Sequence, residues 1–280
     1  MWVFFGDENL SSPISVRSRI FQVFLLAGYA IRQEHLHPLL AGMEQVKNSV
    51  GLQLRHPVKY NLRDSGVTEY FEQRGEAALL ASAITQADPL RLGLLNLLKK
   101  YNAKTFACVL GGLGFVGKRE YYTWAAANLL QRIGWLANPT AVHPDLLVCL
   151  DWPMQKVGKA YFEVYHTPWH DGRSLEGHPF SCGTLRHRKA FPDIVVSSTI
   201  YNPYLQLADI VTGATMDFVN WTLTKNHRQR VDTFFPPVAD AFHRVTGYAL
   251  SQTTFVSAPP RLKARIGQAY TEVFPGRTLA

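Results

Sequence analysis

The chain has 280 residues, of which 47% are hydrophobic and 18% charged, which excludes an intrinsically disordered protein and allows a sizeable core. Its formal charge of +8 favours polyanionic partners such as nucleic acid, although many basic proteins bind none. The three cysteines are odd in number and widely spaced, which argues against a disulfide framework and favours a reducing, cytoplasmic setting.

The N-terminal half is predicted to mix strands and helices. Its most apolar stretch, residues 21–31, is shorter than the ~20 residues of a membrane-spanning helix, and the N-terminus lacks the basic region of a signal peptide. We therefore expect no membrane association. Residues 52–75 are polar and less regular, with a basic extended piece at 55–60. Hydrophobic spacing predicts strands at 3–5, 19–29 and 105–110, and helices at 33–50, 76–85 and 89–101.

The C-terminal half continues the alternation. Residues 152–193 are rich in Gly, Pro and His and are predicted to form loops with one hairpin. Strands are predicted at 145–150 and 194–198, and helices at 120–136, 203–223, 231–245 and 260–274. Interleaved strands and helices predict a layered α/β domain.

Three aspartates lie at the edges of buried elements. Asp7 follows the apolar run of residues 1–6, Asp151 ends an apolar strand, and Asp209 lies within an apolar helix. A carboxylate in such a place is costly to desolvate unless a partner offsets the cost, and a shared divalent cation is one such partner. The pattern indicates a metal-dependent enzyme. Taken singly, each acid is also compatible with a turn or a helix cap.

These acids carry a family resemblance. The strand ending in Asp7-Glu8, together with residues 197–209 (SSTIYNPYLQLAD), resembles domain of unknown function 3800, a family similar to the ribonuclease-H-like superfamily. The resemblance covers roughly residues 1–225, and the Gln-x-Ala-Asp helix is its most specific part. The chain departs from the family at residues 9–10, where Asn-Leu replaces the usual Ser-Gly.

The resemblance implies a single ribonuclease-H-like domain over residues 1–280: a mixed sheet flanked by helices, with a core over 1–225 and a C-terminal helical extension over 226–280. In that fold the first and fourth strands are neighbours, so Asp7, Asp151 and Asp209 would meet and hold Mg²⁺ or Mn²⁺. It further implies a hydrolase, a nuclease acting on RNA or DNA, in a bacterial or phage setting such as defence. The alternative is a non-catalytic member that binds nucleic acid or protein.

Two neighbours of these acids are candidate catalytic residues. Gln206 lies one helical turn before Asp209 and would orient a ligand or touch substrate. Glu8 alternates to the opposite side of the strand from Asp7, so it ranks second.

Several basic residues are candidates for contact with a nucleic-acid backbone, and a solvated surface charge is the alternative for each. Lys118 and Arg119 start a predicted helix, and Lys59 lies in the basic extended piece. The remaining candidates directly follow the Asp209 helix: Lys225, Arg228 and Arg230.

Two other motifs compete with this interpretation. Residues 112–118 satisfy the Gly-x4-Gly-Lys pattern of a phosphate-binding loop, which suggests a nucleotide phosphatase, but Arg119 stands where that motif needs Ser or Thr. The segment 166–187 has spacing that hints at zinc, yet Pro168 interrupts the first pair and the segment looks like loop. Its candidate ligands are His166, His170, His178, Cys182 and His187.

Overall fold

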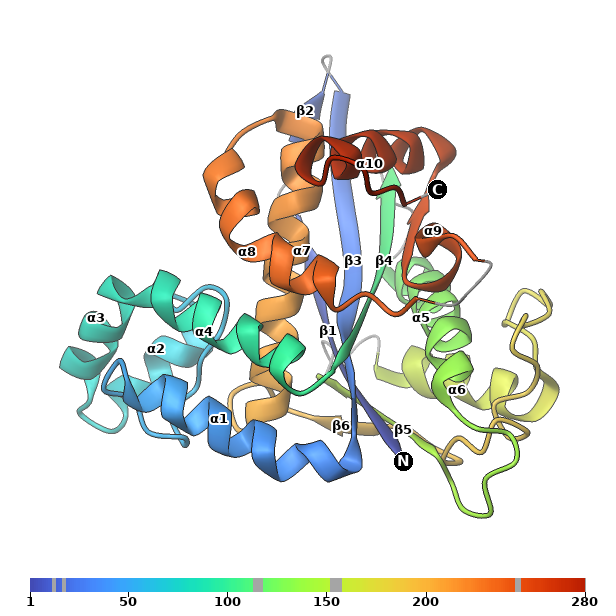
Figure 1. The fold of residues 1–280 in the computed structure, drawn as a ribbon, viewed down its shortest axis with the longest axis horizontal. Coiled ribbons are helices and arrows are strands. Elements are labelled where there is room, and N and C mark those ends of the chain that lie inside the picture. The colour runs from blue at the N-terminus through green and yellow to red at the C-terminus, as the bar shows by residue number, and fades with distance from the viewer. Residues whose placement is uncertain (12–13, 17–18, 113–117, 152–157, 245–247, 280) are drawn as a thin grey trace.

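The structure, a computed structural model, describes residues 1–11, 14–16, 19–112, 118–151, 158–244 and 248–279. It is an α/β fold with one mixed sheet between two layers of helices (Figure 1). Six strands lie in the order β6-β5-β1-β3-β4-β7. Their bounds are β1 (Trp2–Leu10), β3 (Arg19–Arg32), β4 (Lys104–Gly112), β5 (Leu146–Asp151), β6 (Val195–Ser197) and β7 (Phe255–Ala258).

The strand directions divide the sheet into two parts. Strands β1, β3 and β4 form an antiparallel meander, and the short β2 (Ile14–Val16) pairs with β3. Strand β5 runs parallel to β1, β6 parallel to β5, and β7 parallel to β4. This arrangement is compatible with the expected ribonuclease-H-like sheet, in which the first strand and the strand carrying the second acid are neighbours.

Side chains on β1 alternate between two cores, as a strand buried on both faces requires. Val3 and Phe5 belong to one core, and Trp2 and Phe4 to the other. At the pairing of Gly6 with Gly28 the two strands approach closely. A Cβ at Gly28 would lie 2.0 Å from the carbonyl oxygen of Phe5, so only glycine fits there.

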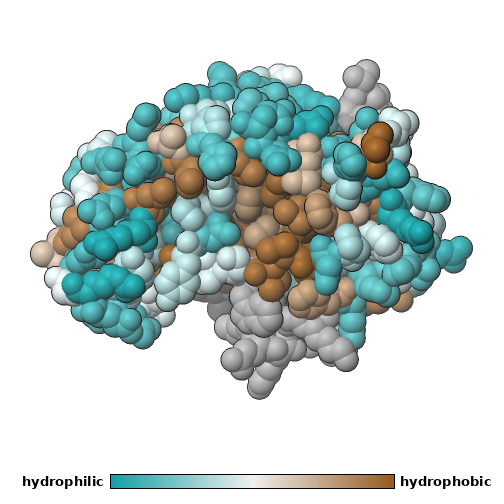
Figure 2. Space-filling model, turned by 90° about the horizontal axis from the view of Figure 1, so that it is seen from below, coloured by the Kyte–Doolittle hydropathy of each residue, from teal (hydrophilic) through white to brown (hydrophobic). Residues whose placement is uncertain are grey.

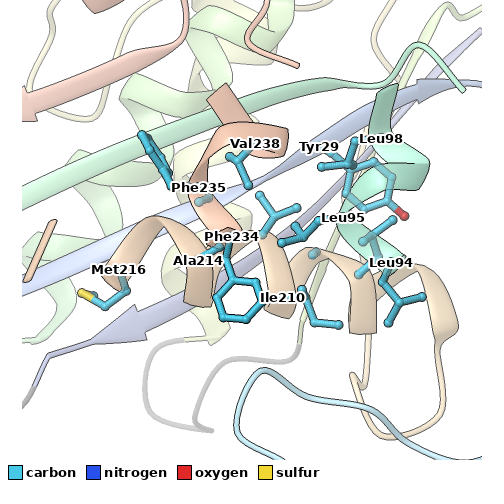
Figure 3. Packing of buried hydrophobic residues seen from close by; sticks show 14 of the residues in the cluster. Tyr29, Leu94, Leu95, Leu98, Ile210, Ala214, Met216, Phe234, Phe235 and Val238 are labelled. Atoms are coloured by element: carbon cyan, nitrogen blue, oxygen red, sulfur yellow. The ribbon is translucent and has the colours of Figure 1, made fainter. Parts of the chain in front are cut away.

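Helix α7 (Pro203–Thr224) is the central helix of one face and lies across β1 and β3. Figure 3 shows side chains of α4 and α8 meeting the residues of α7 and Tyr29 of β3. This continuous core explains why so much of α7 is apolar on every side. The helices of this face are α1 (Leu36–Asn48), α2 (Ser65–Glu72), α3 (Ala77–Thr85), α4 (Ala87–Lys100), α8 (Arg228–Asp240) and α10 (Pro260–Val273).

Helices α5 (Lys118–Ile133) and α6 (Gly158–Asp171) cover the opposite face. The segment 152–193 is not mostly loop, because α6 occupies its first described part, and the expected hairpin is reduced to one antiparallel bridge between Arg173 and Pro179. Tyr161, Val164, Tyr165 and Pro168 are all buried, and this i, i+3, i+4, i+7 stripe is a helical signal that outweighs the proline in the last turn.

The C-terminal segment was expected to be a purely helical extension. It also supplies β7, which lies at the sheet edge beside β4. The short helix α9 (Leu250–Thr253) precedes β7. The 3-10 turns Gln33–His35 and Gly134–Leu136 complete the described elements. Both α2 and β7 lacked a periodic sequence signal long enough to reveal them.

All three cysteines are buried free thiols. Within the described part of the chain, no helix is both long and apolar enough to cross a membrane. Seen from below, the surface has hydrophobic residues gathered near its centre and hydrophilic residues around them (Figure 2).

Candidate functional site: an acid cluster at the sheet edge

The sheet register brings two of the three aspartates to the same level. Gly6 of β1 pairs with Leu150 of β5 in parallel, and the next residue on each strand is an acid, Asp7 and Asp151. The third, Asp209, comes from α7. That helix is joined to β1 by Thr212, whose Oγ1 donates to the carbonyl oxygen of Asp7 at 3.4 Å.

The carboxyl groups of Asp7 and Asp209 lie close enough for each to shift the pKa of the other. Asp7 is buried, with 6% of its surface exposed, whereas Asp209 is partly exposed. Burial, followed by the charges of Asp209 and Asp151, raises the pKa of Asp7 well above its usual range. Burial likewise raises the pKa of Asp209. Both shifts favour the protonated form of each group relative to an isolated aspartate.

Asp151 is oriented by the loop that precedes α7. Its Oδ1 accepts a hydrogen bond of 2.7 Å from the backbone N–H of Thr199. The same loop ends at Asn202, whose side chain caps α7 by accepting from the N–H of Tyr204 at 3.0 Å. The residues of the Ser-Asn-Gln-Asp motif thus fix the start of the helix that carries Asp209.

The basic extended piece at residues 55–60 lies beside the three acids. The backbone N–H of Tyr60 donates to Oδ2 of Asp209, and the ammonium group of Lys59 lies 3.5 Å from Oδ1 of Asp64. Burial lowers the pKa of Lys59, but nearby carboxylates outweigh it and the net pKa is raised. Those carboxylates are Asp209, Asp64, Asp7 and Asp151. Among the basic candidates whose side chains the structure describes, Lys59 is the one that the fold brings to the acids.

Glu8 lies on the opposite face of β1, as the alternation predicted. Its Oε2 accepts from the hydroxyl of Tyr161 at 2.6 Å, and its Oε1 accepts from the hydroxyl of Tyr122. Both carboxylate oxygens are thus held by tyrosines of α5 and α6. The contacts describe a structural anchor rather than a ligand.

A pocket of about 340 Å³ lies beside the cluster. Asp209, Glu8 and Lys59 line it together with the aromatic rings of Phe24 and Tyr121, which stack with their centroids 6.0 Å apart. Both rings are buried, with 2% of Phe24 and 7% of Tyr121 exposed, so they form an apolar wall of the pocket beside the acids and the lysine.

Gln206 does not take its predicted role. It is 1% exposed, and its Oε1 accepts a hydrogen bond of 2.6 Å from Nζ of Lys47. The same ammonium group donates to the carbonyl oxygens of Leu54 and His56. Lys47, which the sequence did not single out, therefore ties the loop before Tyr60 to the helix that carries Asp209.

The basic residues after α7 are paired with carboxylates. Lys225 lies 2.7 Å from Glu272, and Arg230 lies 2.8 Å from Asp217. Arg228 is 2.7 Å from Asp232. These ion pairs lie at the surface, so contact with a nucleic-acid backbone stays a prediction for all three. The side chains of Lys118 and Arg119 lie outside the described residues, as do positions 113–117 of the glycine-rich motif.

In the histidine segment, His166 and His170 lie on α6 with ring centroids 4.3 Å apart. No three His, Cys, Asp or Glu side chains among the described residues are arranged to hold a metal ion. This applies to the histidine segment and to the three aspartates alike. The acids supply the oxygen donors that Mg²⁺ and Mn²⁺ prefer, and the charges of Asp209 and Asp151 both raise the pKa of Asp7.

Comparison with protein-family models, with curated proteins and with solved structures gave no match. The geometry of the acid cluster and its surroundings is thus the basis for a functional assignment.

Proposed function

We propose that this protein is a nuclease that depends on Mg²⁺ or Mn²⁺ and hydrolyses phosphodiester bonds of RNA or DNA. The observation that carries the proposal is the meeting of Asp7, Asp151 and Asp209 at one sheet edge, close enough to act on one another's charge. The acids come from positions 144 and 58 residues apart, so only the fold unites them.

The sheet supports this proposal. An antiparallel meander of three strands, followed by two parallel strands on the other side of β1, is compatible with a ribonuclease-H-like domain. The resemblance of residues 197–209 to domain of unknown function 3800 leads to the same fold independently. A fold alone does not define an activity, so the site carries the functional argument.

The roles of the residues follow from their positions. Asp7 and Asp209 would hold the cation, with Asp151 as a third oxygen donor. A bound divalent cation would supply charge neutralisation at the scissile phosphate and activation of water. Lys59 lies within the field of the same acids and would contact a substrate phosphate.

The test uses labelled single-stranded RNA and DNA with purified protein in Mn²⁺, Mg²⁺ or EDTA. We expect cleavage with either cation and none in EDTA, and loss of at least 100-fold in Asp209→Asn, which keeps the shape of the side chain but removes its charge. Asp232→Asn is the matched control, because Asp232 is an exposed acid of α8 that pairs with Arg228 and is not part of the cluster.

Cleavage that persists in EDTA, or in folded Asp209→Asn, would contradict the proposed site. Binding of the labelled strands without cleavage in either cation would instead favour a non-catalytic binding protein. That alternative is consistent with the lack of a set of three metal ligands among the described residues.

A further inference from the structure

A second pocket, of about 480 Å³, lies between the end of α5 and the segment from α9 to α10. Arg132 of α5 lines it, eleven residues after Tyr121 at the acid cluster, which is about 16 Å along a helix. None of the described residues lines both pockets. The second pocket is therefore separate from the proposed nuclease site.

Arg132 is a partly buried positive charge that has no carboxylate partner among the described residues. Its Nη1 donates to the carbonyl oxygen of Asn128 at 2.9 Å and to Oε1 of Gln131 at 3.2 Å. Its Nε is buried with no hydrogen-bond partner, and no ion pair joins it to a carboxylate within the described ranges. Burial lowers the pKa of Arg132. An anion in the pocket would offset this desolvation.

The rest of the lining suits the same kind of ligand. Lys263 of α10 adds a second positive charge, and the lining of the pocket contains no acid among the residues that the structure describes. Hydroxyl donors come from Ser181, Ser251 and Ser257. Hydroxyls beside two cations are the groups that typically bind phosphate oxygens.

Two aromatic rings also line the pocket and are unusually exposed. Trp135 is 38% exposed and Tyr248 is 59% exposed. The guanidinium group of Arg188 covers the Trp135 ring, with its carbon 4.5 Å from the ring centroid. Exposed rings beside an anion site favour a ligand with a flat aromatic part.

We propose that this pocket binds a nucleoside 5′-phosphate, with the phosphate at Arg132 and Lys263 and the base against Trp135 or Tyr248. Its volume lies in the range of small-molecule sites, roughly 300–1,000 Å³. The proposal does not depend on the acid cluster. It predicts that ligand binding is independent of divalent cations and of Asp209.

The experiment is isothermal titration of the full chain with AMP, adenosine and inorganic phosphate, in EDTA. We expect AMP to bind more tightly than either fragment. Arg132→Gln should weaken the binding of AMP by about tenfold or more and leave the affinity for adenosine unchanged, since a charge-assisted hydrogen bond contributes about that factor. Trp135→Leu should weaken the binding of AMP and of adenosine alike.

Lys263→Gln and Arg265→Gln form the matched pair, because both remove a positive charge from α10 and only Lys263 lines the pocket. Lys263→Gln should weaken the binding of AMP several-fold, and Arg265→Gln should leave it unchanged. Lys263 is exposed, so this pair remains informative even if Arg132→Gln fails to fold.

Absence of AMP binding to the folded protein at millimolar ligand would overturn the proposal. So would AMP affinity that is unchanged in both Arg132→Gln and Lys263→Gln. A 5′-phosphorylated trinucleotide, added to the complex with AMP, identifies the source of the ligand. If it competes with AMP, the pocket binds the 5′ end of a nucleic-acid strand; if it does not compete, the pocket binds a free nucleotide. Asp209→Asn should bind AMP normally, which separates this result from that of the nuclease test.

Discussion

The ring of Tyr60 packs so closely on Gly213 of α7 that a Cβ at Gly213 would lie 2.1 Å from Cγ of the ring. Gly213 lies one turn after Asp209 and one turn before Asp217. Tyr60 contacts all three turns, because its N–H binds Asp209 and its hydroxyl donates to Oδ2 of Asp217 at 2.5 Å. One residue thus holds the loop that carries Lys59 against the acid cluster.

Gly213→Ala should therefore displace Tyr60 from α7. An inserted methyl group that clashes with a packed ring typically costs about 1–3 kcal/mol, and here it would also break the contact with Asp209. We expect the free energy of unfolding, measured with urea, to fall by that amount. Metal-dependent cleavage should fall with it.

Gly267→Ala is the control for this prediction. Gly267 lies within α10, and a Cβ there would meet nothing within 4 Å. Alanine at such a helical position should stabilise the protein by about 0.5–1 kcal/mol. A Gly213→Ala protein as stable as wild type would show that the contact with Tyr60 does not restrain the loop.

The raised pKa of Asp7 predicts how stability depends on pH. A carboxyl group with a raised folded pKa binds more protons when folded, so the free energy of unfolding falls as the pH rises above the unfolded value near 3.8. Asp7→Asn should then be more stable than wild type at pH 7, by about 1 kcal/mol or more, with the difference vanishing toward pH 4. Urea unfolding in EDTA from pH 4 to pH 8 measures this.

A variant less stable than wild type at pH 7 would contradict the prediction. It would mean that the ionised Asp7 gains more from the N–H of Glu8, which lies 2.7 Å from its Oδ1, than it loses by burial. Asp232→Asn should show no comparable change, since Asp232 is exposed.

Divalent cations should offset the loss of stability that the buried acids cause at pH 7. A cation that binds only the folded protein at ten times its Kd adds about 1.4 kcal/mol to the free energy of unfolding. We expect Mn²⁺ to raise the thermal midpoint of the wild type at pH 7. It should have little effect on Asp7→Asn or Asp209→Asn, and an unchanged midpoint in the wild type would count against a cation site at the acids.

Lys47 should matter for stability although it touches no acid of the cluster. Its ammonium group donates to Gln206 and to two backbone carbonyls, so Lys47→Met leaves three acceptors without a donor, two of them in buried hydrogen bonds, and should cost about 2–5 kcal/mol. Hydrogen exchange of the amides of residues 54–60 should accelerate. Lys99→Met, a change on an exposed surface of α4, is the control.

The pKa of Lys47 also predicts how the stability of the protein depends on pH. Burial lowers it to about 7, whereas the unfolded value is 10.5. The unfolded chain binds the proton more tightly, so this group makes the wild type more stable as the pH rises from about 7 toward 10.5. That rise should be absent from Lys47→Met.

The sequence predicted the parts of the site that depend on local pattern. Apolar runs that end in Asp7 and Asp151 identified the two strands, and strand alternation placed Glu8 on the opposite face. The role of Gln206 was beyond prediction, because its partner Lys47 is 159 residues away. A lysine on a helix is expected to lie at the surface, and only the fold reveals the loop that surrounds Lys47.

The anchoring of Glu8 is tested by two tyrosines of α6 that lie one turn apart. The hydroxyl of Tyr161 donates to the carboxylate of Glu8 at 2.6 Å, and that of Tyr165 donates to the carbonyl oxygen of Phe191 at 2.7 Å. A hydrogen bond to a charged group contributes about 1.5–3 kcal/mol and a neutral one about 0.5–1.5 kcal/mol. Tyr161→Phe should therefore destabilise the protein more than Tyr165→Phe in urea unfolding. Metal-dependent cleavage should survive both changes, because Glu8 lies on the opposite face of β1 from Asp7 and is not a proposed metal donor, although it lines the same pocket as Asp209. Loss of cleavage in folded Tyr161→Phe alone would assign Glu8 a part in the reaction.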